Sequence, residues 1–161
     1  MTCSIRITLA LVVCVMLLLN CDDDAAPKDQ RKVIVEELYL IFDTGQTDKL
    51  PQIVSTDLID YDLAAPPGTS GYKGLENLIV TLNIGFTDMR HELEQIELID
   101  DDRIFVRWRL TGKHTGTFLD IPPSGKNVDF NGHDLFVVRD GKIVEQWHVE
   151  ELLNLITQIQ E

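Results

Sequence analysis

Four runs of residues with strand periodicity follow one another with no helical pattern between them. They span about 91–99, 103–114, 128–139 and 142–149, and turn-forming sequences separate them: three consecutive aspartates, a Pro-Pro-Ser-Gly stretch and an Asp-Gly pair. Strands joined in this way pair as antiparallel hairpins, and an Asp-Gly pair is typical of a tight one. The pattern therefore predicts a curved antiparallel sheet.

Apolar residues at helical spacing lie on both sides of these strands. They predict helices over 29–43 and 75–86, a short helix around Leu50, and a C-terminal helix after Val149. A further strand is predicted over 58–63. Each helix must bury its apolar stripe, and one face of the sheet is the largest surface available. The expected fold class is α+β: a curved antiparallel sheet wrapped by helices into a cone, a cystatin-like α+β barrel.

The first 20 residues differ from the rest of the chain. Residues 7–19 are almost entirely apolar and follow Arg6, which is typical of a signal peptide and too short for a comfortable membrane span. Cys21 closes the apolar run, an arrangement that resembles the lipobox of bacterial lipoproteins. The predicted organisation is a lipoprotein signal peptide (1–20), an acidic tether (21–30) and one folded domain (31–161).

Lipidation of Cys21 would hold the protein in the cell envelope as a membrane-anchored lipoprotein. Three aspartates follow the cysteine directly. Such a run resembles a surface-export signal of some lipoproteins, and it is equally compatible with a solvated linker. The predicted location is the outer membrane or the cell surface.

Charge and cysteine usage exclude several classes of function. The net charge is −13, whereas a nucleic-acid-binding protein needs a basic surface, so no nucleic acid is expected as a partner. All three cysteines lie within the first 21 residues, which leaves the domain no thiol for a disulfide, a nucleophile or a metal site. No histidine and carboxylate spacing matches a metal-ligand pattern, and we predict no metal and no cofactor.

Strand parity identifies the residues expected inside the cone. Successive side chains of a strand point to opposite faces, and the even positions of 104–114 form the more apolar face. Trp108 and His114 are therefore expected inside. In the next strand, parity favours Asp134 inside, and it turns the neighbouring His133 to the other face.

The last strand is expected to turn its odd positions inward. These include Trp147, and Glu151 shares their parity if the strand extends that far. Both faces of the strand around Leu135 are apolar, which predicts that a second copy of the chain covers the outer face of the sheet. We therefore expect a homodimer.

Several motifs together resemble one family. They are Thr-Gly-Lys-His-Thr-Gly (111–116), Ile-Pro-Pro-Ser-Gly-Lys (121–126), Phe-Asn-Gly-His-Asp-Leu-Phe (130–136) and Asp-Gly-Lys-Ile-Val-Glu-Gln-Trp (140–147). With these motifs in this order, the chain resembles the SnoaL-like polyketide cyclase or ester cyclase family, which has the nuclear-transport-factor-2-like fold. The resemblance implies an apolar pocket and ring closure by an intramolecular aldol step without metal or organic cofactor. It also implies a general acid/base four positions after the tryptophan, where this chain has Glu151 in place of the usual aspartate.

Aldol chemistry needs a base for a carbon acid and a donor for the enolate oxygen. The candidate catalytic residues are Glu151, Asp134 and His114, and the candidate substrate-binding residues are Tyr61, Trp108, His133 and Trp147. Each has a structural alternative. Glu151 suits the start of the final helix, His114 could cap a sheet edge, Asp134 could accept a structural hydrogen bond, and the aromatic residues could belong to the core. His91 and His148 are expected at the surface.

Two functions remain open from the sequence. One is a cofactor-independent cyclase, isomerase or hydrolase that acts by general acid/base chemistry on a small hydrophobic carbonyl compound. The other is a non-catalytic lipoprotein that binds a hydrophobic ligand or a protein partner. The same fold serves both kinds of function. In either case the expected partners are a small hydrophobic molecule, a second copy of the chain and a membrane through Cys21.

Overall fold

The computed structural model describes residues 28–62 and 66–160. The helices are α1 (Gln30–Thr44), α2 (Leu50–Ile53), α3 (Gly71–Gly85) and α4 (Leu152–Gln160), with a 3₁₀ turn, η1 (Thr47–Lys49), before α2. The strands are β1 (Val54–Asp60), β2 (Phe86–Leu98), β3 (Arg103–His114), β4 (Asn127–Arg139) and β5 (Lys142–Glu150). The predicted elements are all present, with shifted ends.

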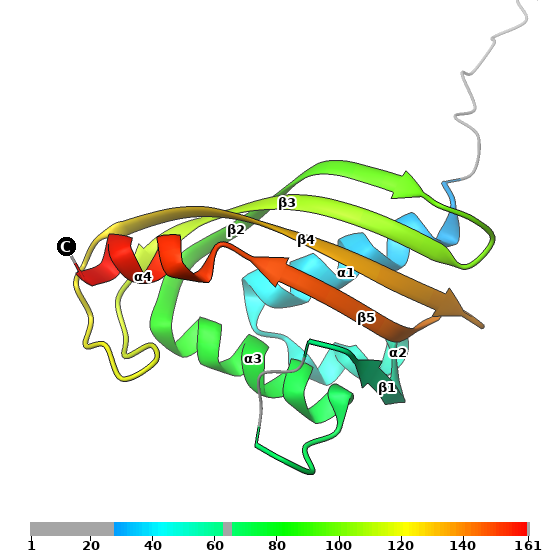
Figure 1. Ribbon diagram of the computed structural model, residues 1–161, viewed down its shortest axis with the longest axis horizontal. Coiled ribbons are helices and arrows are strands. Elements are labelled where there is room, and N and C mark those ends of the chain that lie inside the picture. The colour runs from blue at the N-terminus through cyan, green and yellow to red at the C-terminus, as the bar shows by residue number, and fades with distance from the viewer. Residues whose placement is uncertain (1–27, 63–65, 161) are drawn as a thin grey trace, which may run out of the picture.

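The five strands form one sheet in the order β1-β5-β4-β3-β2. Strands β2 to β5 are joined as antiparallel neighbours, as predicted, but β1 pairs with β5 in parallel. Helix α3 carries the chain from β1 to β2 at the opposite edge of the sheet (Figure 1). The chain then returns strand by strand, so β5 reaches β1 in the same direction. The predicted antiparallel sheet thus comprises β2 to β5, and β1 adds a parallel strand at its edge.

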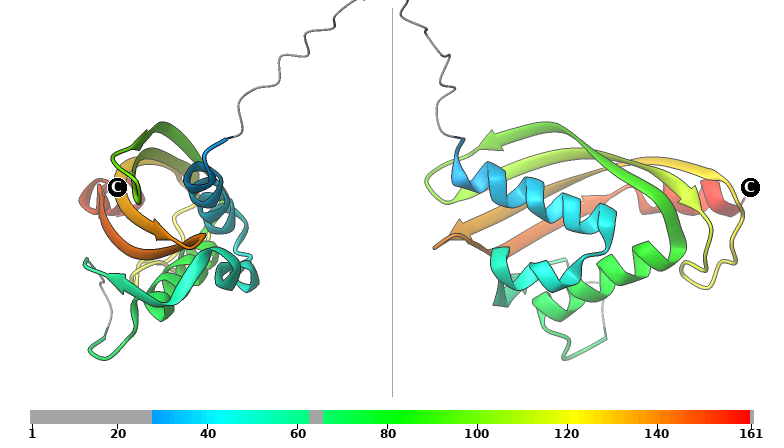
Figure 2. Two further views of the ribbon diagram at one scale, coloured as in Figure 1. Left: turned by 90° about the vertical axis from the view of Figure 1, so that its right-hand side faces the viewer. Right: turned by 180° about the vertical axis from the view of Figure 1, so that it is seen from behind.

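The sheet is strongly curved, and helices close its concave side. Seen from the end of the molecule, the sheet bends around an interior that α1 and α3 complete (Figure 2). Helix α1 packs against β2, α3 against β1 and α4 against β4. The α+β cone predicted from the sequence is confirmed.

The boundaries of the two long helices follow from local capping. Asp29 precedes α1 and its side chain accepts a hydrogen bond from the backbone N–H of Arg31. Gly45 ends α1 with a φ of 69°, the left-handed conformation that glycine adopts without strain. Ser70 caps α3 through the backbone N–H of Lys73, so this helix begins four residues before the predicted start. These caps fix where α1 and α3 meet the sheet.

Strand parity holds for β3 and β4 and fails for β5. The inner face of β3 carries Trp108, and the inner face of β4 carries Asp134, as expected. On β5 the pairing runs from Ile143, opposite Val138, to Glu145, opposite Val137, so the strand contains one extra residue. This bulge reverses the faces of everything that follows it. After the bulge, the even positions of β5, from Gln146 to Glu150, therefore face the interior.

The predicted signal peptide (1–20), the lipidated Cys21 and most of the tether lie outside the described residues, and these features remain predictions. In the two described segments, no helix is both long enough and apolar enough to cross a membrane.

Candidate active site

A mostly apolar cavity of about 90 Å³ lies between the concave face of the sheet and the helices. Its apolar wall includes Leu38, Phe42, Leu75, Leu82, Phe130 and Leu155, and its polar lining consists of Tyr39, His91, Asp134, Gln146, His148 and Glu150. Leu78 of α3 and Leu152 of α4 also line the cavity and are partly exposed, whereas Tyr39 is buried. The cavity therefore opens between α3 and α4 and ends beside α1.

Asp134 carries the one carboxyl group at the inner end of this cavity beside α1, in the part of the chain that the structure describes. The hydroxyl of Tyr39 and the indole N–H of Trp108 both donate hydrogen bonds to its Oδ2. Its Oδ1 accepts no hydrogen bond from any described residue. Burial raises the pKa of Asp134 from 3.8 to about 6, because the ionised form loses its hydration. Burial next to this carboxyl also raises the pKa of Tyr39.

The indole of Trp108 reaches Asp134 because the facing residue has no side chain. Trp108 on β3 lies opposite Gly132 on β4. A Cβ atom added to Gly132 would stand 2.0 Å from Cζ2 of the indole, well inside van der Waals contact. The ring therefore lies over Gly132 and extends its N–H to the carboxylate two residues further along β4. Glycine at 132 is a structural requirement of the site.

His91 forms a second polar group at the same end of the cavity. Its Nδ1 is 2.6 Å from Oδ1 of Asp43, at the end of α1, and its backbone N–H donates to the same carboxylate at 3.1 Å. The side chain is only 3% exposed, so the expectation of a surface histidine is wrong. The reason is a bulge in β2, where Asp88 has a φ of 55° and the pairing with β3 shifts. The shift turns His91 inward.

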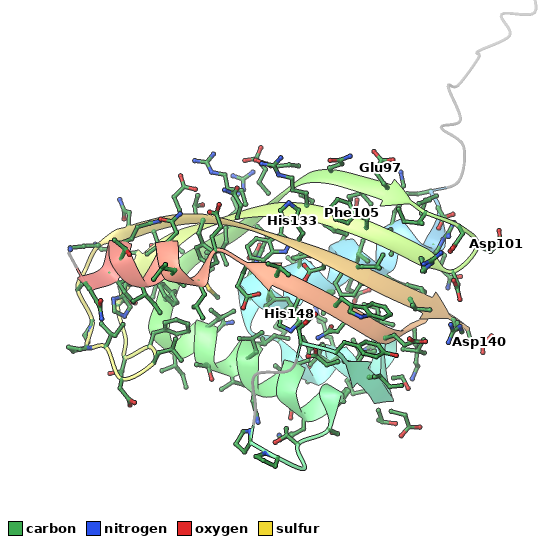
Figure 3. The ribbon with its side chains drawn as sticks, viewed as in Figure 1. Glu97, Asp101, Phe105, His133, Asp140 and His148 are labelled. Carbon is green, nitrogen blue, oxygen red and sulfur yellow. The ribbon has the colours of Figure 1, made fainter. Side chains whose placement is uncertain are left out.

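His148 lies nearer the middle of the cavity, in a cluster of charged groups. Its Nε2 is 3.3 Å from Asp60 and its Nδ1 is 3.1 Å from Glu150. The hydrogen bonds that the ring donates to Asp60 and then to Glu150 raise the pKa of His148 to about 10, so the ring is an imidazolium at neutral pH. Gln146 donates to the second oxygen of Asp60 at 2.8 Å. The prediction that His148 lies at the surface is also wrong, because the bulge in β5 turns it inward (Figure 3).

Glu151 does not line the cavity. It precedes α4 and is exposed, and its carboxylate accepts hydrogen bonds from the backbone and side chain of Asn131 and from Asn154. These hydrogen bonds, that from Asn154 first, lower its pKa. Its backbone carbonyl accepts the first hydrogen bond of α4, from Leu155. The expectation that Glu151 shares an inner face with Trp147 is therefore wrong, and the residue sits where an acid favours a helix start.

Three of the aromatic candidates lie on the outer face of the sheet. Trp147 stacks on Tyr61 with ring centroids 4.3 Å apart and planes within 2°, and Tyr61 is 52% exposed. His133 stacks on Phe105 on the same face, beside the middle of β4 (Figure 3). The expected inward position of Trp147 and Tyr61 is wrong because of the bulge in β5 and because β1 turns Asp60 inward instead. His133 also points away from the cavity, as strand parity requires, so the hypothesis that it binds substrate there is wrong as well.

His114 is fully buried, but it lies outside the lining of the cavity. Its Nδ1 accepts a hydrogen bond from the backbone N–H of Ser124 and contacts the Ser124 hydroxyl at 3.1 Å. Among the described residues, Nε2 of His114 is the one buried side-chain nitrogen or oxygen atom that has no hydrogen-bond partner. His114 thus ties the loop between β3 and β4 to the end of the sheet, in keeping with the structural alternative for this residue.

No group of three or more His, Cys, Asp or Glu side chains within 28–62 and 66–160 is arranged to hold a metal ion. The polar groups of the cavity instead belong to three hydrogen-bonded sets, one around Asp134, one around His91 and one around His148. Among these, Asp134 and Trp108 were predicted from the sequence. Tyr39, Asp43, His91, Gln146, His148 and Glu150 were not.

Comparison with known proteins identifies the family. The model of the SnoaL-like polyketide cyclase family matches residues 32–159, which is most of the chain. The protein belongs to the SnoaL-like family. The resemblance stated from the motifs is confirmed, and the matched segment contains every residue of the cavity described above.

Individual proteins are similar to this chain in sequence or in fold. The aklanonic acid methyl ester cyclase DnrD of Streptomyces peucetius is 25% identical over 133 residues, which cover 80% of this chain and 89% of DnrD. TsrD from Streptomyces laurentii superposes with a TM-score of 0.72 at 21% identity, covering 81% and 95% of the two chains. A Bacillus cereus protein superposes with a TM-score of 0.68 at 29% identity, covering 81% and 80%.

Proposed function

We propose that this SnoaL-like protein is a cofactor-independent cyclase or isomerase in which Asp134 acts as general acid/base on a small hydrophobic carbonyl compound. The observation that carries the proposal is a buried carboxyl group with a free oxygen at the end of an apolar cavity. Its pKa of about 6 lies near neutral pH, where a group can both accept and release a proton. An acid of ordinary pKa would remain a carboxylate and would be a weaker base.

We propose a separate task for each oxygen of Asp134. Oδ2 is held by Tyr39 and Trp108, which fix the direction of the carboxyl group and stabilise its ionised form. Oδ1 is the oxygen available to a substrate. In an aldol closure it takes the proton from the carbon next to the carbonyl group, and the resulting enolate carbon attacks a second carbonyl group of the same molecule. The proton then passes from Asp134 to the new alkoxide, so atoms and charge balance.

The relatives support this class of substrate. DnrD is named for the cyclisation of a methyl ester, and it is similar over nearly the whole domain of this chain. The apolar wall of the cavity favours a hydrophobic substrate, and the gap between α3 and α4 provides a route of entry.

The proposed role of Asp134 is tested by turnover with a panel of hydrophobic keto esters and aryl ketones. Cyclised products are detected by mass spectrometry, and exchange at the carbon next to the carbonyl group is followed by NMR in D₂O. Asp134→Asn should lower turnover by at least about 100-fold. The matched control is Asp129→Asn, which removes a carboxylate from the outer face of the same strand and should leave turnover unchanged. Full activity of Asp134→Asn would refute the proposal, and ligand binding without turnover in the wild type would favour a binding protein.

We also propose that the domain is anchored through lipidated Cys21 and pairs with a second copy through the outer face of the sheet. The stacked Tyr61 and Trp147 and the exposed Val149 support the second part, because they place apolar surface on that face. Mass spectrometry of membrane fractions from wild type and Cys21→Ala tests the anchor. Light scattering of Trp147→Lys tests the dimer, and an unchanged molar mass would contradict it.

A further inference from the structure

The pair formed by His91 and Asp43 is a second titratable group of the cavity that the chemistry of Asp134 does not use. The ring of His91 packs between those of Tyr39 and Trp108, with centroids at 5.1 and 5.2 Å. These are the two residues that donate hydrogen bonds to Asp134. His91 and Asp134 therefore flank the same end of the cavity, one from β2 and the other from β4.

Asp43 determines which nitrogen of His91 faces the cavity. A carboxylate carries no hydrogen, so the proton of the 2.6 Å hydrogen bond belongs to Nδ1 of His91. The backbone N–H of His91 donates to the same carboxylate, which holds the strand and the ring together. Nε2 makes no hydrogen bond to any residue of the described segments. This nitrogen is the one available to a ligand, and the aromatic rings around it fix its direction.

We propose that His91 is a second catalytic acid/base, which exchanges a proton with the carbonyl oxygen of the substrate while Asp134 exchanges one with the neighbouring carbon. Asp43 is its positioning residue. The inference rests on the proposed function of Asp134 and extends it to the oxygen side of the reaction. It also narrows the substrate to compounds with an acidic C–H group on the carbon next to a carbonyl group, such as hydrophobic ketones and keto esters.

The proton movements balance without another reactant. Asp134 removes the proton from carbon, the C–H electron pair forms the C=C bond, and the carbonyl oxygen takes the Nε2 proton of the imidazolium form of His91. The enol then attacks the second carbonyl group, and the new C–C bond forms. His91 takes back the enol proton, and Asp134 gives its proton to the new alkoxide. Asp43 holds the ring in position throughout this cycle through the hydrogen bond to Nδ1.

The test uses 4-nitrophenol, a small hydrophobic phenol whose ionised oxygen resembles an enolate and absorbs visible light. It is added to the full-length protein at a pH below the pKa of the free phenol. Wild type should bind it partly as phenolate, and His91→Gln should lower the bound phenolate fraction at least about tenfold. His133→Gln is the matched control, because this histidine lies on the outer face. Asp43→Asn keeps an oxygen acceptor for Nδ1 and should show a smaller decrease.

Turnover measurements complete the test. His91→Gln should lower kcat by at least about 100-fold, and Asp43→Asn should change the pH profile of kcat with little change in KM. An unchanged phenolate fraction in His91→Gln, or no binding of 4-nitrophenol to wild type, would overturn the role of His91. If His91→Gln does not fold, the bound phenolate fraction and the kcat of Asp43→Asn test the role of His91 instead. The role of Asp134 is judged separately by the turnover of Asp134→Asn, so failure of one proposal is distinguishable from failure of the other.

Discussion

Replacing Asp134 with asparagine should change the way in which stability depends on pH. The native pKa of this carboxyl is about 6, compared with 3.8 for an exposed aspartate. The folded state therefore binds the proton more tightly than the unfolded state, and this contribution to stability is present below pH 3.8 and is lost as the pH rises through 6. The shift corresponds to about 3 kcal/mol. Asparagine keeps an oxygen for Tyr39 and Trp108 but does not titrate.

The assay is urea unfolding of wild type and Asp134→Asn at several pH values between about 3.5 and 7.5. The free energy of unfolding of wild type minus that of the variant should decrease by about 3 kcal/mol across this range. The control is Asp129→Asn, whose carboxylate is paired with Arg109 and has a lowered pKa. The stabilisation that the wild-type Asp129 carboxylate provides should instead be lost as the pH falls. A difference for Asp134→Asn that is constant within about 0.5 kcal/mol, or that increases with pH, would refute a buried carboxyl with a raised pKa.

Three further substitutions test other parts of the site. Gly132→Ala should push the indole of Trp108 away and cost about 1–3 kcal/mol in urea unfolding, with a loss of turnover; a variant of wild-type stability and activity would contradict the contact. His148→Gln should be most destabilising below pH 6.5, where the ion pair with Asp60 is complete. The difference in free energy of unfolding between wild type and this variant should decrease by at least about 1 kcal/mol as the pH approaches 10. A difference that does not change with pH would contradict the ion pair. Glu151→Gln should leave turnover within about twofold of wild type, because this residue is exposed and lies outside the cavity lining. A large loss of turnover would contradict the placement of Glu151 outside the active site.

The fold was predictable because its signals are local and repeated. Alternating apolar residues and Asp-Gly or Pro-rich turns determine β2 to β5, and caps such as Asp29 and Ser70 determine where the long helices begin. The placement of Trp108 and Asp134 followed from simple alternation, because β3 and β4 pair without interruption over that stretch. Regular strands therefore reveal their inner residues in the sequence.

The rest of the site depends on bulges that no local pattern indicates. One extra residue in β5 moves His148 inside and Trp147 outside, and one extra residue in β2 moves His91 inside. A bulge depends on how a strand pairs with its neighbour, which is a tertiary property. Tyr39 had a weaker signal, since it lies one helical turn after the buried Val35 in α1. The sequence therefore identified Trp108 but not Tyr39 beside Asp134. It could not identify the pair formed by His91 and Asp43.

The role of Asp134 can be tested by a crystal structure of the protein with a hydrophobic ketone from the turnover screen. The ketone should occupy the cavity between α3 and α4, with the carbon next to its carbonyl group about 3–3.5 Å from Oδ1 of Asp134. A ketone bound instead on the outer face of the sheet beside Trp147, with the cavity unfilled, would contradict this role.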